Sequence, residues 1–227
     1  LMNKFLIFSF FILILLSCKK DIPQPYDLSY SYTYFGLIKG NYVLYEVVEI
    51  THDENAIVQH DTLRYQLKTL IGDTLYDNSG RIANRFFRSK RPDANSPWSI
   101  TDVWTTIIAN NKAELVEENQ RIVKLIFPFS KQMTWNSNQF NPNAANACFY
   151  SSIDYSAFIG TFPFDHLVQV EQADERNLVV YKRHFEVYAQ NVGLVRKYYK
   201  DLNIANFDTL NIKSGKELFM DVIGYGN

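Results

Sequence analysis

The sequence predicts an all-β protein whose strands form a strongly curved antiparallel meander, either closed into a barrel or left as a half-barrel. Aromatic residues make up 15% of the 227 residues, with 17 Phe and 15 Tyr, and large rings suit half-buried strands. Several segments alternate apolar and polar residues with a period of two, and none holds a helical apolar stripe for more than two turns. A two-sheet sandwich is the alternative fold.

The first predicted strands are long and well patterned. Residues 42–50 (YVLYEVVEI) are rich in β-branched and aromatic side chains. Residues 61–71 alternate most clearly and place Leu63, Tyr65 and Leu67 on one face, which points inward if the sheet is curved. The turns predicted to follow these two strands are the polar segments 52–55 and 77–80.

Short strands and polar turns continue through the middle of the chain. Strands are predicted at residues 81–88, 103–109, 113–117 and 122–127. Asn110-Asn111 and Glu118-Asn119 separate the last three strands and predict tight hairpins. Pro128 lacks a backbone N–H and is expected to end the last of these strands.

The remainder of the chain begins with a loop and continues as strands. Residues 136–147 are rich in Asn and predict a loop, with a short helix at 143–149. A long hairpin is predicted from strands 167–172 and 178–190, joined by a turn at 173–176. Two further strands are predicted at residues 194–199 and 218–224.

The second strand of that hairpin has two different faces. Its apolar face is expected to point inward and carries Tyr181, Phe185 and Val187. Its polar face is expected to contact solvent and carries Lys182, His184 and Glu186. The alternation therefore predicts either a filled barrel or an apolar groove, and not a polar catalytic cleft.

The N-terminal residues predict export from the cytoplasm and lipidation. Residues 5–16 are apolar except for Ser9, which is too short for a membrane-spanning helix but typical of a signal peptide. The next residues, Leu15-Leu16-Ser17-Cys18, resemble the lipobox of bacterial lipoproteins. This resemblance implies cleavage before Cys18 and acylation of its thiol and new amine with chains such as palmitate, which together give stable membrane anchoring.

Two further motifs resemble envelope lipoproteins of the Bacteroidetes. These motifs are GNYVLYE at residues 40–46 and YAQNVGLVRK at residues 188–197. The resemblance implies a β-rich lipoprotein and supplies no catalytic residue. Lys19, rather than Asp, follows the lipidated cysteine, which favours the outer membrane over the inner membrane by the enterobacterial sorting rule.

These features divide the sequence into three parts. Residues 1–17 are the predicted signal peptide, and residues 18–33 are a predicted lipidated tether stiffened by Pro23 and Pro25. Residues 34–227 form the predicted single β domain. The expected localisation is the cell envelope, with the lipid in the outer membrane.

Composition and motifs give no support to several function classes. With 23 Lys+Arg against 24 Asp+Glu, the net charge of -1 provides no field for binding nucleic acid. No glycine-rich phosphate loop, metal-binding histidine motif or nucleophile motif is present, so we expect no cofactor, no metal and no catalytic residue. Once Cys18 is acylated, Cys148 is left without a disulfide partner and is expected to be a small buried residue.

Trp135 is the best candidate for ligand binding among Trp98, Trp104 and Trp135. It precedes the Asn-rich loop, where amide side chains are available to bond ligand hydroxyls. The alternative is that its ring belongs to the core, as most tryptophans in β domains do.

A repeated tripeptide marks candidate modification sites. Asp-Thr-Leu occurs at residues 61–63, 73–75 and 208–210. It matches the Asp-(Ser/Thr)-apolar acceptor of the O-glycosylation system of Bacteroidetes envelope proteins, which implies possible acceptors at Thr62, Thr74 and Thr209. The alternative is that Asp favours turns and Thr favours strands, so the pair simply begins strands.

We therefore expect a non-enzymatic envelope lipoprotein that binds an apolar ligand or a partner protein. The alternative is a structural or accessory component of an outer-membrane complex with no small ligand. A hollow interior favours the first hypothesis, and a filled core with an exposed apolar patch favours the second.

Overall fold

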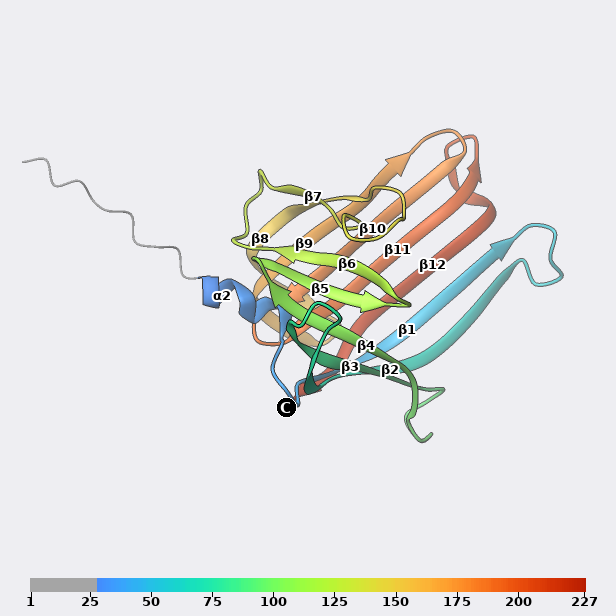
Figure 1. Ribbon diagram of the computed structural model, residues 1–227. Helices are drawn as coiled ribbons and strands as arrows, with labels where there is room; N and C mark the ends of the chain where they lie inside the picture. The colour runs from blue at the N-terminus through green and yellow to red at the C-terminus, as the bar shows by residue number, and fades with distance from the viewer. Residues whose placement is uncertain (1–27) are drawn as a thin grey trace, which may run out of the picture.

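The computed structural model describes residues 28–227, which fold into one antiparallel sheet (Figure 1). The predicted signal peptide, Cys18 and residues 19–27 lie outside the described residues. The twelve strands are β1 (Tyr42–Asp53), β2 (His60–Tyr76), β3 (Ile82–Arg91), β4 (Ser99–Ala109), β5 (Lys112–Glu117), β6 (Gln120–Ile126), β7 (Thr134–Asn136), β8 (Ala147–Ile159), β9 (Phe162–Arg176), β10 (Val180–Ala189), β11 (Gly193–Ala205) and β12 (Asp208–Gly226).

The strands follow a meander with one long-range pairing. Their order in the sheet is β6-β5-β4-β3-β2-β1-β12-β11-β10-β9-β8-β7, so only the β1–β12 pair joins strands that are distant in the sequence. The sheet curls so that its two halves face each other, giving a nearly closed, barrel-like shape (Figure 1). The predicted all-β, strongly curved meander is confirmed, and the two-sheet sandwich is not formed.

Edge strand β6 is bonded to β7, to the residue that follows β7 and to β8. The Val123 N–H donates to Ser137 O at 2.9 Å, and Trp135 Nε1 donates to Val123 O at 3.1 Å. The Tyr150 hydroxyl accepts from the Ile126 N–H at 2.8 Å and donates to Ile126 O at 2.6 Å. These bonds satisfy backbone groups that an open sheet edge leaves unpaired.

The predicted tight hairpins of the middle segment are confirmed. Asn110 and Asn111 have φ values of 50° and 58°, and Glu118 and Asn119 have φ values of 46° and 61°. Two consecutive residues with positive φ match the twist of the flanking strands, which is why short polar pairs close these hairpins.

The structure differs from the sequence prediction at one turn and at one predicted helix. Strand β9 runs through the predicted turn at 173–176, and the chain reverses at Asn177 instead. The Asn177 Oδ1 accepts from the backbone N–H groups of Val179 and Val180 at 3.0 and 2.8 Å, and this side-chain turn sets the position of the hairpin. The predicted helix at 143–149 is also wrong, because Cys148 in β8 pairs with Trp135 in β7.

A short helical segment packs against the sheet before the first strand. It consists of α2 (Leu28–Tyr32) and the 3-10 turn η1 (Thr33–Phe35). Ser31 and Tyr34 are buried, and the Tyr32 ring contacts Phe127 edge-on at 4.9 Å. Residues 28–33, expected as part of the tether, therefore belong to the folded domain, since their aromatic rings bury apolar surface on it.

Gly36 ends this segment and is required there by its surroundings. It has a φ of 62°, and a Cβ at this position would lie 2.4 Å from the carbonyl oxygen of Val192. Only glycine allows both the positive φ and this close approach. The contact fixes the N-terminal segment against the β10–β11 turn.

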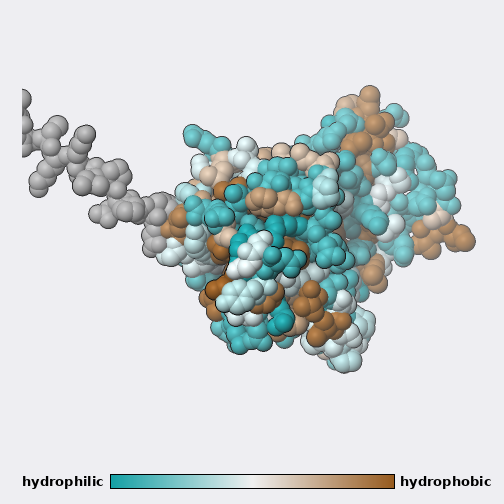
Figure 2. Space-filling model, viewed as in Figure 1, coloured by the Kyte–Doolittle hydropathy of each residue, from teal (hydrophilic) through white to brown (hydrophobic). Residues whose placement is uncertain are grey.

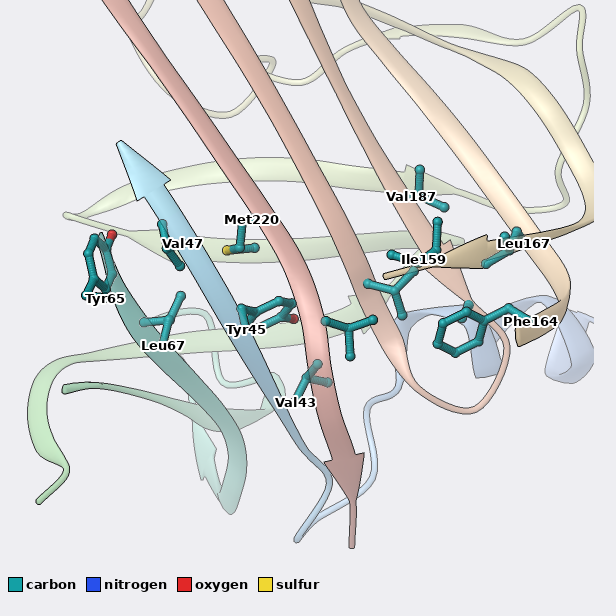
Figure 3. Packing of buried hydrophobic residues seen from close by; sticks show 13 residues of the cluster. Val43, Tyr45, Val47, Tyr65, Leu67, Ile159, Phe164, Leu167, Val187 and Met220 are labelled. Atoms are coloured by element: carbon teal, nitrogen blue, oxygen red, sulfur yellow. The ribbon is translucent and has the colours of Figure 1, made fainter. Parts of the chain in front are cut away.

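Buried apolar side chains form two clusters. The main cluster contains Val43, Tyr45, Val47, Tyr65, Leu67, Ile159, Phe164, Leu167, Val187, Ala189, Val195, Met220 and Val222. Figure 3 shows part of it, with Tyr45 and Val47 from β1 near Met220 from β12. The closure cluster contains Tyr34, Ala113, Val123, Leu125, Phe127, Trp135, Cys148, Tyr150, Val168, Val170 and Tyr188. The closure cluster thus brings together side chains of both edge strands.

Candidate ligand-binding cavity

A cavity of about 140 Å³ lies inside the curve of the sheet. Side chains from both halves of the sheet and from the N-terminal segment line it, and most of them are apolar. Its volume is close to that of an engineered apolar cavity of about 150 Å³ that binds benzene. Pockets that bind larger ligands have volumes of ~300–1,000 Å³, so this cavity is smaller than those. The interior is therefore partly hollow, with room for one small ring or a short chain.

One wall of the cavity is a row of side chains that crosses five strands. Tyr65 pairs with Val47, Val47 with Met220, Met220 with Lys197, and Lys197 with Glu186. Directly paired residues in antiparallel strands point to the same face, and all five line the cavity. The row passes from apolar groups on β2, β1 and β12 to charged groups on β11 and β10.

The opposite wall is built from strands β3 to β6. The rings of Phe86 and Trp104 stack with 6.3 Å between centroids, and the Arg88 guanidinium lies 4.2 Å from the Trp104 ring. Arg88 also forms an ion pair with Asp102, with 2.9 Å between Nη1 and Oδ2. This arrangement holds the arginine against the wall. Glu117 and Lys124 complete the charged groups of this wall.

Glu186 is the centre of the charged part of the cavity. Its Oε1 lies 2.6 Å from Lys124 Nζ and 3.9 Å from Lys197 Nζ, and its Oε2 accepts from the Tyr188 hydroxyl at 2.6 Å. Burial raises the pKa of this carboxyl, but the ammonium groups of Lys124 and Lys197 outweigh burial and lower the pKa to about 2. Glu186 is therefore ionised at neutral pH despite being buried.

The two lysines beside Glu186 differ in their electrostatic environment. Burial alone lowers the pKa of Lys124, but the attraction of Glu186 outweighs it, so the pKa lies above its usual value. Burial lowers the pKa of Lys197 below its usual value, with the charge of Lys124 adding to burial and the more distant Glu186 opposing both. Lys124 is thus the direct partner of Glu186, and Lys197 is the less compensated cation.

Two side chains of β10 lie contrary to the sequence prediction, whereas Val187, also expected to point inward, is buried in the main cluster. Glu186, expected to contact solvent, lines the cavity and is 1% exposed. Phe185, expected to point inward, lies on the other face, where its ring stacks on Tyr198 at 4.9 Å. Tyr198 also contacts Phe219 at 5.0 Å. This cross-strand row of rings, rather than the interior, accommodates the aromatic face of β10.

For β2, the expected inward face is confirmed along part of the strand. Tyr65 and Leu67 are buried and line the cavity. Leu63 lies on the same face, but nearer the β1–β2 turn, and its side chain is 57% exposed. The strand extends beyond the cavity, so its alternation continues where there is no interior to fill.

Trp135 does not occupy the position expected of a ligand-binding platform. It is 6% exposed and belongs to the closure cluster, with its Nε1 bonded to Val123 O. Trp104 lines the cavity instead. Both tryptophans lie in strands, and only the assembled sheet shows which ring faces the cavity. The Arg91 guanidinium covers the Trp98 ring at 4.3 Å.

The candidate modification sites differ in exposure. Thr62 and Thr74 in β2 are exposed, whereas Thr209 in β12 is half-buried. Cys148 is buried, and burial raises the pKa of its thiol to about 11. Its thiol is therefore protonated at neutral pH and is a poor nucleophile.

The four histidines lie at three separate places. His52 and His60 contact each other at 2.8 Å between their Nδ1 atoms, and His52 Nε2 lies 2.9 Å from Glu217 Oε1. His166 contacts Asp154, and His184 stacks on Tyr199. Within residues 28–227, no group of three or more His, Cys, Asp or Glu side chains has the arrangement of a metal site.

The comparisons with known proteins show structural similarity only. No protein-family model matches the chain, and a search of the curated proteins finds no match. The structure is similar to that of a protein described as "a putative lipoprotein" from Parabacteroides distasonis, with a TM-score of 0.42 and 11% sequence identity. The match covers 83% of this chain and 97% of that chain. No ligand or activity is transferred from this distant similarity. Among residues 28–227, no helix is long and apolar enough to cross a membrane.

Proposed function

We propose that this chain is a lipid-anchored protein of the bacterial cell envelope that binds a small apolar ligand inside its curved sheet. The cavity carries this proposal, because an apolar space of about 140 Å³ lies in the interior where a filled core would leave none. The lipobox at Cys18 supports the envelope location and the anchoring, with the outer membrane as the proposed membrane.

A binding role agrees better with the cavity than a catalytic role. The Glu186 carboxylate is ionised and bonded to Lys124 and Tyr188, so it is neither a free base nor a proton donor. Arg88 is held by Asp102 and Trp104. We therefore propose that the charged groups of the cavity orient a ligand without reacting with it.

Ligand binding is tested with a small neutral ring compound. Benzyl alcohol is expected to bind the mature protein, raise its melting temperature and change the fluorescence of Trp104, which lines the cavity. Val47→Phe fills the cavity and should abolish binding, provided that circular dichroism shows a folded protein. Val103→Phe is the matched control, since Val103 is 54% exposed. Binding that persists in folded Val47→Phe contradicts the proposal.

The anchor is tested separately from the cavity. Cys18→Ala should leave the precursor without acyl chains and unprocessed or released from the membrane. Cys148→Ala is the control and should leave lipidation unchanged. Intact-mass measurement of the mature protein decides the question, and an unmodified Cys18 thiol on a processed chain rejects the lipoprotein assignment.

Exposed apolar side chains favour a second candidate function, the binding of an envelope partner protein. They lie at the tips of three hairpins at one end of the sheet, and Figure 2 shows brown surface at these tips. The residues are Ile57, Val58, Leu178, Val179, Phe207 and Leu210. The bond from Phe207 N to Leu178 O joins the tips of the β9–β10 and β11–β12 hairpins, and the bond from Glu54 N to Lys213 O joins the β1–β2 hairpin to β12.

This second candidate is tested independently of the cavity. Ile57→Asp combined with Leu210→Asp should reduce cross-linking of the anchored protein to its partner in the native envelope, because both side chains are almost fully exposed. Affinity for benzyl alcohol should not change. If the cross-linking pattern is the same in the double variant, the partner-binding candidate is rejected.

A further inference from the structure

Lys197 is the ammonium group of the cavity that lacks a close partner. Lys124 binds Glu186 Oε1 at 2.6 Å, and the Tyr188 hydroxyl binds Oε2. Lys197 Nζ remains 3.9 Å from Oε1, beyond hydrogen-bond distance. Among residues 28–227, no other acceptor is hydrogen-bonded to Lys197 Nζ. Its donors are therefore available to a group inside the cavity.

Among the charged groups of the cavity, Lys197 is the cation most available to bind a ligand. Arg88 is already paired with Asp102. Glu117 lines the cavity but has no ion-pair partner within 4.0 Å among residues 28–227, so it does not neutralise Lys197 by direct contact. Its negative charge nonetheless lies in the same cavity, and it should repel an anion and attract a cation.

We propose that the cavity binds a small amphiphilic carboxylate, whose apolar part fills the space and whose anionic group binds Lys197. The ligand carboxylate would accept a hydrogen bond from Lys197, as the carboxylate of Glu186 does from Lys124. The volume of about 140 Å³ limits the apolar part to about one ring or a short chain. This inference rests on the proposed ligand-binding function and adds the charge class of the ligand.

The test uses three ring compounds of similar size and different charge. Benzoate, benzyl alcohol and benzylamine are titrated into the mature protein, and their dissociation constants are measured by calorimetry or NMR. We expect benzoate to bind most tightly and benzylamine most weakly. Benzoate should exceed benzyl alcohol by about tenfold or more, as expected for a charge-assisted hydrogen bond.

Variants of Lys197 and Glu117 identify the cause of this preference. Lys197→Met should weaken benzoate binding more than benzyl alcohol binding and so remove the advantage of benzoate, with circular dichroism showing that the variant is folded. Lys197→Arg should keep the advantage, because it keeps the charge. Glu117→Gln should tighten benzoate binding by removing a like charge. Lys182→Met is the matched control, since its side chain is 37% exposed, close to the 34% of Lys197, and lies outside the cavity lining.

The outcomes separate the two proposals. If none of the three compounds binds, the ligand-binding function is rejected together with this inference. If benzyl alcohol or benzylamine binds as well as benzoate, the ligand-binding function stands and the anionic class is rejected. If benzoate keeps its advantage in Lys197→Met, the anion binds elsewhere and the role of Lys197 is rejected.

Discussion

Lys124 on β6 and Glu186 on β10 form an ion pair across the interior of the curved sheet, with 2.6 Å between Nζ and Oε1 although 62 residues separate them. Their side chains are only 10% and 1% exposed. The pair connects an edge strand of one half of the sheet with a central strand of the other half. The ion pair therefore helps to hold the two halves of the sheet together, as the hydrogen bonds between the edge strands do.

Removing either member of this pair should destabilise the protein, but not equally. Glu186→Gln removes the carboxylate that Lys124 and Lys197 share and should cost about 3–5 kcal/mol of unfolding free energy. Lys124→Met leaves Lys197 near Glu186 and should cost about 1–3 kcal/mol. Urea denaturation of both single variants and the double variant measures these costs. Equal costs, or additive costs in the double variant, contradict the proposed sharing of Glu186 by two lysines.

The same carboxyl predicts a loss of stability in acid. The pKa of Glu186 is lowered to about 2 in the folded protein from 4.5, so folding favours the ionised form. Its contribution, about 3 kcal/mol, is complete above the unfolded pKa and is lost as pH falls from about 5 toward 2. Stability should therefore fall less over this range in Glu186→Gln than in the natural protein. A parallel pH dependence in the two proteins contradicts the prediction.

The fold class and many turns were predictable because they depend on local sequence. Polar pairs such as Asn110-Asn111 adopt positive φ at little cost, and the alternation in β2 identifies Tyr65 and Leu67 as one buried face. The turn at Asn177 was misplaced, because the acidic residues before it also suit a turn. Only the side-chain bonds of Asn177 distinguish the two positions.

The charged part of the cavity was not predictable from alternation. A period of two separates the faces of β10 but does not say which face points inward, and Glu186 looks like a solvent-exposed residue. Its burial is stabilised by Lys124 on a distant strand and by Tyr188. Phe185 is accommodated outside by Tyr198, from a strand that follows in the sequence. Such pairings become visible only when the strand register is known.

Glycan attachment should follow the exposure of the three Asp-Thr-Leu sites. In protein from the native envelope, Thr62 and Thr74 should carry glycan more fully than Thr209, which is half-buried. Thr62→Ala and Thr74→Ala should each remove one glycan mass and change stability by less than about 0.5 kcal/mol. Site mapping by mass spectrometry measures this, with exposed Thr101, which follows Ile100, as the unmodified control. Full occupancy at Thr209 alone contradicts the prediction.

The helical segment before β1 should contribute strongly to stability, although the sequence places part of it in a tether. Tyr34 is 1% exposed and its ring contacts Phe129 at 5.0 Å, so Tyr34→Ala should cost about 3–5 kcal/mol. Tyr30→Ala is the matched control, because Tyr30 is 45% exposed, and it should cost less than about 1 kcal/mol.

Truncation tests the same segment as a unit. A chain beginning at residue 37 should melt well below one beginning at residue 28, since it loses the rings that cover Phe127 and Phe129. Calorimetry of both chains and of the two tyrosine variants gives the comparison. If the two chains melt together and Tyr34→Ala has no larger effect than Tyr30→Ala, the segment does not pack on the sheet in solution. The domain would then begin at β1, after the boundary at residue 34 that the sequence predicts.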